Sequence, residues 1–133
     1  LHTNDAAGGA IRLIDMGIDP YLIASSVQLF TAQRLVRVIC ADCREGYESE
    51  GQTRFRGRGC RRCNGSGYRG RSLIGEFLPL RAEIQDLILA KRSAREIRDQ
   101  ADALGMKKLA DDGWDKVARG ITTADEVFRV TTL

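Results

Sequence analysis

The chain has 133 residues, of which 43% are hydrophobic and 6% aromatic, and its formal net charge is +3. This is the composition of a globular domain, or of a piece of a larger one, with few aromatic rings in its core. The apolar runs are short and interrupted by charge, so none reaches the ~18 residues that a membrane-spanning helix needs.

The first residues do not read as a secretion signal. The chain begins with Leu1, and residues 1–5 lack basic and apolar signal character, so we expect a segment of a longer protein. Leu1-His2 reads as the end of a buried strand. A helix follows, capped by Thr3, Asn4 or Asp5 and stopped at Gly17.

Further along, Asp19-Pro20 provides a cap and a first helical residue for a second helix, which we expect to be buried and to run from Pro20 to about Thr31. Residues 35–39 alternate with β-branched side chains and predict a strand. The polar, glycine-rich residues 44–59 predict a loop or ribbon, residues 64–71 predict turns, and residues 72–80 predict a strand that stops at Pro79.

The remainder is predicted to be helical. One helix runs from Glu83 to Lys91, and Ser93 with Glu96 forms a capping box for the next. Trp114 is expected in the core of a third helix, and a last short helix begins after Thr122 or Thr123 and reaches Val130.

Four cysteines form two pairs in the pattern C-x2-C-x16-C-x2-C: Cys40, Cys43, Cys60 and Cys63. Without a secretion signal, this pattern favours a metal over disulfides and a reducing compartment. Zinc suits four thiolates best, and a site with four protein ligands has no open position, so its role is structural. An iron centre and uncoordinated or disulfide-linked cysteines are the alternatives.

A run of arginines surrounds the second cysteine pair. Residues 52–71 contain seven arginines and no acidic residue, at positions 54, 56, 58, 61, 62, 69 and 71. A zinc tetrathiolate carries about −2 charge, so nearby arginines and the N–H groups of Gly65 and Gly67 would stabilise it. Subunit contacts, membrane phosphates or nucleic acid would also account for such a run, although only Phe55 and Tyr68 could stack on bases there.

Several blocks carry a family likeness. Leu1-His2-Thr3-Asn4-Asp5-Ala6 and Arg12-Leu13-Ile14-Asp15-Met16-Gly17 resemble the histidine-box region of type II secretion and type IV pilus assembly ATPases. Ala32-Gln33-Arg34-Leu35-Val36-Arg37, the cysteine pairs, and the segment from Asn64 to Arg71 resemble the next blocks, and the likeness continues to Gly120-Ile121-Thr122-Thr123. Residues 72–77 depart from the family pattern, and the loop between the cysteine pairs is short.

The resemblance implies an α/β fold: the C-terminal part of a RecA-like ATPase domain (residues 1–39), a zinc-binding insertion (40–71), and a strand with a helical C-terminal subdomain (72–133). It implies a cytoplasmic homo-hexamer that lies at the inner membrane through platform proteins of the machine and uses ATP and Mg²⁺, with no nucleic-acid partner. His2 corresponds to a histidine that faces the nucleotide phosphates, so it is the candidate catalytic residue. Arg34 and Arg37 match a motif without an assigned contact.

The glycine-rich phosphate loop G-x-x-x-x-G-K-[ST] does not occur in these residues. The resemblance implies that the parent protein is an ATPase, and the missing loop predicts that this chain alone is inactive. The alternatives are a zinc-ribbon module that binds nucleic acid and, less favoured, a chaperone-type zinc module. If the family resemblance is set aside, His2 is expected to be a structural residue and Glu76 a solvated or arginine-paired residue. Tyr68 is expected to pack on the zinc knuckle.

Overall fold

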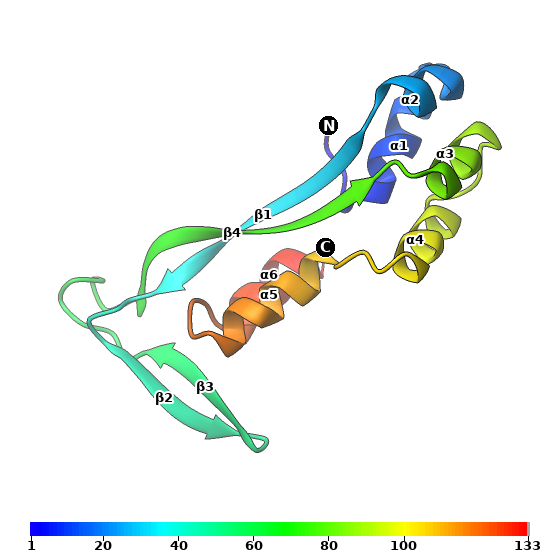
Figure 1. Ribbon diagram of the computed structural model, residues 1–133. Coiled ribbons are helices and arrows are strands. Elements are labelled where there is room, and N and C mark those ends of the chain that lie inside the picture. The colour runs from blue at the N-terminus through cyan, green and yellow to red at the C-terminus, as the bar shows by residue number, and fades with distance from the viewer. Residues whose placement is uncertain (133) are drawn as a thin grey trace. The chain divides into compact units, whose positions relative to one another are not determined.

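The protein is described by a computed structural model, which covers residues 1–132, and it is a mixed α/β chain as expected (Figure 1). Two two-stranded sheets are formed, one by β1 and β4 and one by β2 and β3. No helix among the described residues is long and apolar enough to cross a membrane. The elements in chain order are α1 (Ala6–Asp15), α2 (Pro20–Ser26), β1 (Leu29–Ile39), β2 (Arg44–Ser49), β3 (Gln52–Gly57), β4 (Tyr68–Pro79), α3 (Ala82–Leu89), α4 (Ala94–Ala103), α5 (Leu109–Ala118) and α6 (Ala124–Thr131).

The chain divides into two compact units, each built from two separate stretches of sequence. Unit 1 contains residues 1–33 and 75–108, and unit 2 contains residues 34–74 and those from 109 onward. The division falls inside β1 and β4, so both units include part of these strands.

Unit 1 packs α1–α4 around small and aliphatic side chains. Asp5, one of the three candidate caps, begins α1 by accepting the Gly8 N–H at 2.9 Å. Glu76 is buried, with 4% of its surface exposed, and accepts the Ala6 N–H at 2.6 Å. The expectation of a solvated Glu76 is therefore wrong, because this carboxylate is buried and satisfies the open N-terminus of α1, whereas the alternative of an arginine-paired Glu76 stays a prediction. The buried hydrophobic residues of this unit include Ala7, Ala10, Ile23, Phe30, Leu78, Ile84, Ile88 and Ile97.

Unit 2 contains the β2–β3 hairpin and the pair α5–α6. The hairpin is antiparallel, with Arg44 opposite Gly57 and Ser49 opposite Gln52. Trp114 of α5 is half-buried and meets Phe128 of α6 edge-on, with ring centroids 5.2 Å apart. The buried residues include Val36, Ile39, Ile74, Val117, Thr122, Val127 and Val130.

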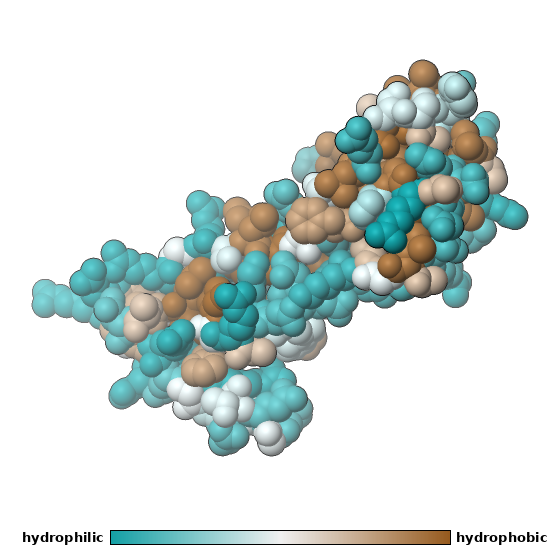
Figure 2. Space-filling model, viewed as in Figure 1, coloured by the Kyte–Doolittle hydropathy of each residue, from teal (hydrophilic) through white to brown (hydrophobic). Residues whose placement is uncertain are grey.

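Figure 2 shows the difference in surface character between the elements. In this view the β2–β3 hairpin is mostly hydrophilic or intermediate, whereas brown residues are frequent over the helices of unit 1. A two-stranded ribbon is at best marginally stable alone. The hairpin therefore depends on its contacts with α5.

The prediction of a long, buried second helix is wrong. The helix ends at Ser26 and the strand begins at Leu29, because Phe30 and Ala32 alternate with exposed neighbours and fit a sheet rather than a helix. Tyr21 and Leu22 of α2 are 67% and 55% exposed.

Two strand predictions also differ from the structure. Leu1 and His2 are exposed and lie outside any strand, since the four described strands pair only with one another and offer no partner ladder. Residues 68–71, predicted as turns, open β4.

Candidate metal centre

The four cysteines meet at the base of the hairpin. Cys40 follows the end of β1 and Cys43 precedes β2, while Cys60 and Cys63 lie between β3 and β4. Cys40 and Cys63 are buried, and Cys43 and Cys60 are partly accessible. The sequence spacing thus predicted the residues that the fold brings together.

The sulfur geometry fits a tetrahedral ion. The Sγ atoms of Cys40 and Cys60 are 3.8 Å apart, as are those of Cys43 and Cys63, and all four lie within 4.8 Å of one another. Zinc–sulfur bonds of 2.3 Å in a tetrahedron require sulfur separations of about 3.8 Å. Disulfides need about 2.05 Å between sulfurs, so these distances describe four ligands and no cross-link.

The second cysteine pair is wrapped by a tight backbone turn. Asn64, Gly65 and Gly67 have positive φ angles of 54°, 76° and 80°. This path lets the Gly67 N–H donate to the Cys63 Sγ at 3.2 Å, as expected, whereas the Gly65 N–H donates to the Cys60 carbonyl instead. A turn of this kind holds a sulfur in place through the main chain.

Two backbone segments, at Gly57 and Gly67, approach so closely here that a side chain would not fit. A Cβ atom on Gly57 would lie 2.1 Å from the Gly67 carbonyl oxygen. The same carbonyl accepts the Cys40 N–H at 2.9 Å, which joins the first cysteine pair to the second. The cluster is therefore built by main-chain contacts as well as by side chains.

The thiols differ in their readiness to ionise. Burial opposes ionisation of Cys63, yet hydrogen bonds from the N–H groups of Cys60 and Gly67 lower its pKa to about 6. Burial raises the pKa of the Cys43 thiol to about 12. A zinc ion would displace the remaining protons, because only thiolates act as ligands.

Three arginines of the run pair with carboxylates and not with the cysteine sulfurs. Arg56 and Arg58 pair with Glu45 at 3.0 and 3.4 Å. Arg62 pairs with Asp42 at 3.1 Å. The N–H donors that reach the Cys63 sulfur belong to the main chain, so these paired arginines act on the cluster only at longer range.

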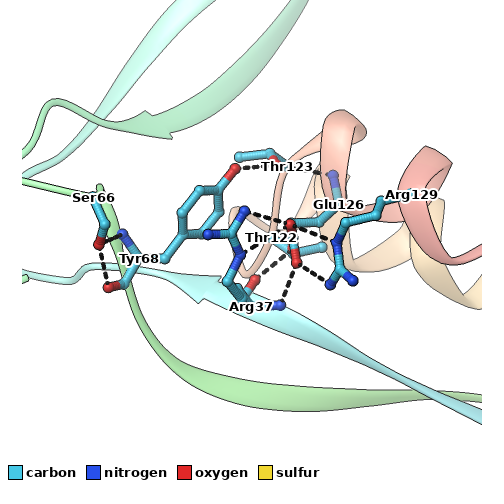
Figure 3. Close-up of polar contacts among 7 residues, drawn as sticks. All are labelled: Arg37, Ser66, Tyr68, Thr122, Thr123, Glu126 and Arg129. Carbon is cyan, nitrogen blue, oxygen red and sulfur yellow. Dashed lines mark hydrogen bonds and ion pairs between the residues drawn. The ribbon is translucent and has the colours of Figure 1, made fainter.

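Unit 2 also contains a buried carboxylate, Glu126, which the sequence did not predict. Glu126 of α6 accepts the backbone N–H of Arg37 at 2.7 Å and its side-chain Nη2 at 2.9 Å (Figure 3). Arg129 adds a contact of 2.9 Å from the other side. Burial would raise the pKa of Glu126, but the hydrogen bonds from Arg129 and Arg37 outweigh it and lower the pKa to about 2.

Tyr68 connects the cysteine turn to this carboxylate network. Its ring lies under the Arg37 guanidinium, 4.2 Å from the guanidinium carbon, and its hydroxyl meets Thr123 Oγ1 at 2.7 Å. Thr123 also caps α6 by accepting the Glu126 N–H at 3.3 Å. Figure 3 shows Ser66 and Tyr68 on one side and the start of α6 on the other.

The candidate catalytic residue lies elsewhere in the chain. His2 is exposed in the segment that precedes α1 in unit 1. This position alone defines no chemical role for its imidazole. Arg34 and Arg37, the two motif arginines, both belong to β1.

Residues 1–129 match the family described as "Type II/IV secretion system protein". The chain belongs to this family. Its relatives in the Type II/IV secretion family include "Type II secretion system ATPase E" of Vibrio cholerae, 42% identical over 98% of this chain and 28% of that protein. "Type II secretion system protein HxcR" of Pseudomonas aeruginosa is 44% identical over 98% of this chain and 27% of its own length.

A pilus protein is nearly as similar. "Type IV pilus assembly ATPase PilB" of Thermus thermophilus is 40% identical over 98% of this chain and 16% of its own length. The chain thus spans less than a third of each of these family members.

Proposed function

We propose that this chain is the C-terminal segment of a hexameric ATPase that powers type II secretion or type IV pilus assembly, and that it carries a structural zinc ion. The observation that supports the zinc ion is the set of four sulfurs at tetrahedral separations. The match over residues 1–129 supports the motor assignment. Because relatives of both kinds are similar, the proposal includes both machines.

The zinc ion would act as a cross-link. The residues between Cys40 and Tyr68 contain few apolar side chains, so metal binding would provide folding free energy that a core does not. Elemental analysis of freshly purified, reduced chain tests this directly. We expect about one zinc per chain, which Cys60→Ser lowers together with the melting temperature, because a ligand is lost.

Arg61→Ser is the matched control, since Arg61 is exposed in the same turn and its replacement leaves four sulfurs. Metal-free wild-type chain, or a Cys60→Ser variant with unchanged metal content and melting, would refute the zinc site. This outcome would leave the family assignment unaffected.

The domain organisation belongs to the same proposal. Residues 1–39 would complete a RecA-like ATPase domain, 40–71 would be the zinc-binding insertion, and 72–133 the helical C-terminal subdomain. His2 would face the nucleotide, and ATP and Mg²⁺ would be held mainly by residues outside this chain. In the complete ATPase, His2→Ala should lower turnover, and normal turnover would reduce His2 to a structural residue.

The proposed setting is the cytoplasmic side of the inner membrane, where platform proteins of the machine would bind the hexamer. The nucleic-acid alternative gains no support from the arginine run. Arg54 and Arg56 of this run, and Arg44 before it, each lie over an aromatic ring that base stacking would need. The absence of salt-dependent DNA or RNA binding by the zinc-loaded chain is the expected result.

A further inference from the structure

A cavity of about 550 Å³ lies in unit 2 between the β2–β3 hairpin and α5. Its hairpin side is formed by Gln52, Thr53 and Arg54, and its helix side by Trp114, Val117 and Ala118. The cysteine cluster, the Glu126 network and His2 contribute no residue to this lining. The proposed function assigns it no role.

Arg54 is the unusual member of this lining. Its Nε is buried and is the one such side-chain nitrogen or oxygen without a hydrogen-bond partner among residues 1–132. Its guanidinium carbon lies 5.6 Å from the centroid of the Trp114 ring. Arg54 differs from Arg56, Arg58 and Arg62, which all pair with carboxylates.

Arg54 as a whole is only partly buried and lines the cavity, and no carboxylate among residues 1–132 pairs with its charge. Because its Nε is closed off, an acceptor in the cavity would bind the two Nη groups, which a carboxylate can match with two parallel hydrogen bonds. The lining supplies one positive charge and no lysine, which suits a single carboxylate better than a doubly charged phosphate. Trp114, Val117 and Ala118 supply an apolar wall for the aliphatic stem of a glutamate.

The charge around the cavity favours an acidic partner. Unit 2 carries 13 arginines and lysines against nine acidic residues, a net charge of +4, although five of those acids lie from residue 109 onward. Such an excess attracts a segment that carries several carboxylates. We propose that this cavity binds a glutamate side chain from an acidic segment of a partner protein, with the carboxylate on Arg54 and the stem against Trp114.

Trp114 is the only tryptophan, so its fluorescence reports on the cavity directly. The test titrates the zinc-loaded chain with poly-L-glutamate at low ionic strength. We expect a saturable change whose affinity falls at least about tenfold in Arg54→Gln, because a partly buried charge pair is lost. Arg58→Gln removes an equal charge from an exposed position and should cost less than about fivefold.

A second pair of variants keeps Arg54 in place. Ala118 is exposed at the rim, so Ala118→Glu offers Arg54 an internal carboxylate and should abolish binding, whereas Ala118→Gln should retain it. Far-UV circular dichroism and zinc content verify that each variant is folded. The proposal fails if poly-L-glutamate causes no saturable change, or if Arg54→Gln and Arg58→Gln behave alike.

Two further probes distinguish other occupants. An Arg54-dependent response to inorganic polyphosphate or phosphatidylglycerol vesicles that poly-L-glutamate does not reproduce would assign the cavity to phosphates and overturn the proposal. Arg54-dependent self-association in sedimentation would assign it to a second copy of the chain and overturn it as well. The zinc and ATPase experiments above are independent of these outcomes.

Discussion

Replacement of Glu126 by glutamine tests whether the buried carboxylate stabilises unit 2. Its side chain is 2% exposed, and the charge is held between Arg37 and Arg129. Glutamine mimics the protonated acid, so the cost follows from the pKa. A fall from about 4.3 in the unfolded chain to about 2 corresponds to about 3 kcal/mol. Both arginines are half-exposed, which reduces the expected loss to about 2–3 kcal/mol.

Urea unfolding at pH 7, followed by Trp114 fluorescence, measures this loss within the same unit. Glu83→Gln is the control, because Glu83 is an exposed glutamate in the first turn of α3. It should change the free energy of unfolding by less than about 0.5 kcal/mol.

The pH dependence has a defined sign. A depressed folded-state pKa gives stability that is fully present above the unfolded pKa and is lost as the pH falls toward the folded value. The difference between wild type and Glu126→Gln should therefore stay constant from pH 7 to about 5 and decline below about 4. A difference under about 0.5 kcal/mol at pH 7, or none of this decline, would refute the reasoning.

Three other substitutions test local features. Gly57→Ala places a methyl group against a backbone carbonyl and should cost about 2–3 kcal/mol in urea unfolding and weaken zinc retention, whereas Gly46→Ala, with ordinary contacts, should do neither. Glu76→Ala leaves the first amide of α1 unpaired, so amide exchange there should quicken and stability should fall by about 1–3 kcal/mol. Tyr68→Phe and Thr123→Ala remove one shared hydrogen bond, so a double-mutant cycle should give a coupling of about 1 kcal/mol, and additive losses would contradict it.

The features predicted correctly from sequence are local ones. Asp5, Asp19, Ser93 and Thr123 each accept a backbone N–H at the start of a helix, as their positions indicate. Two-residue spacing likewise keeps the sulfurs within one cysteine pair close together, as in Cys60 and Cys63. Both features depend on side chains only a few residues apart, whereas the meeting of the two pairs depends on the hairpin.

The features missed depend on distant partners. Glutamate is usually solvent-exposed, but Glu76 and Glu126 are buried, and their hydrogen-bond partners lie 70 and 89 positions away in the sequence. The predicted second helix runs past the observed one, because Phe30 becomes a strand residue only through the pairing of β1 with β4. The cavity beside Arg54 depends in the same way on contact between the hairpin and a helix about 60 residues later.

The alternation of the two units along the chain affects how each is completed during synthesis. All residues of unit 1 are present once Lys108 has been made, whereas unit 2 still lacks α5 and α6 at that point. The sulfur cluster needs nothing beyond Gly67, so the four cysteines can come together before those helices are made. A nascent chain would thus present a hairpin already closed at its base when α5 emerges to pack on β3.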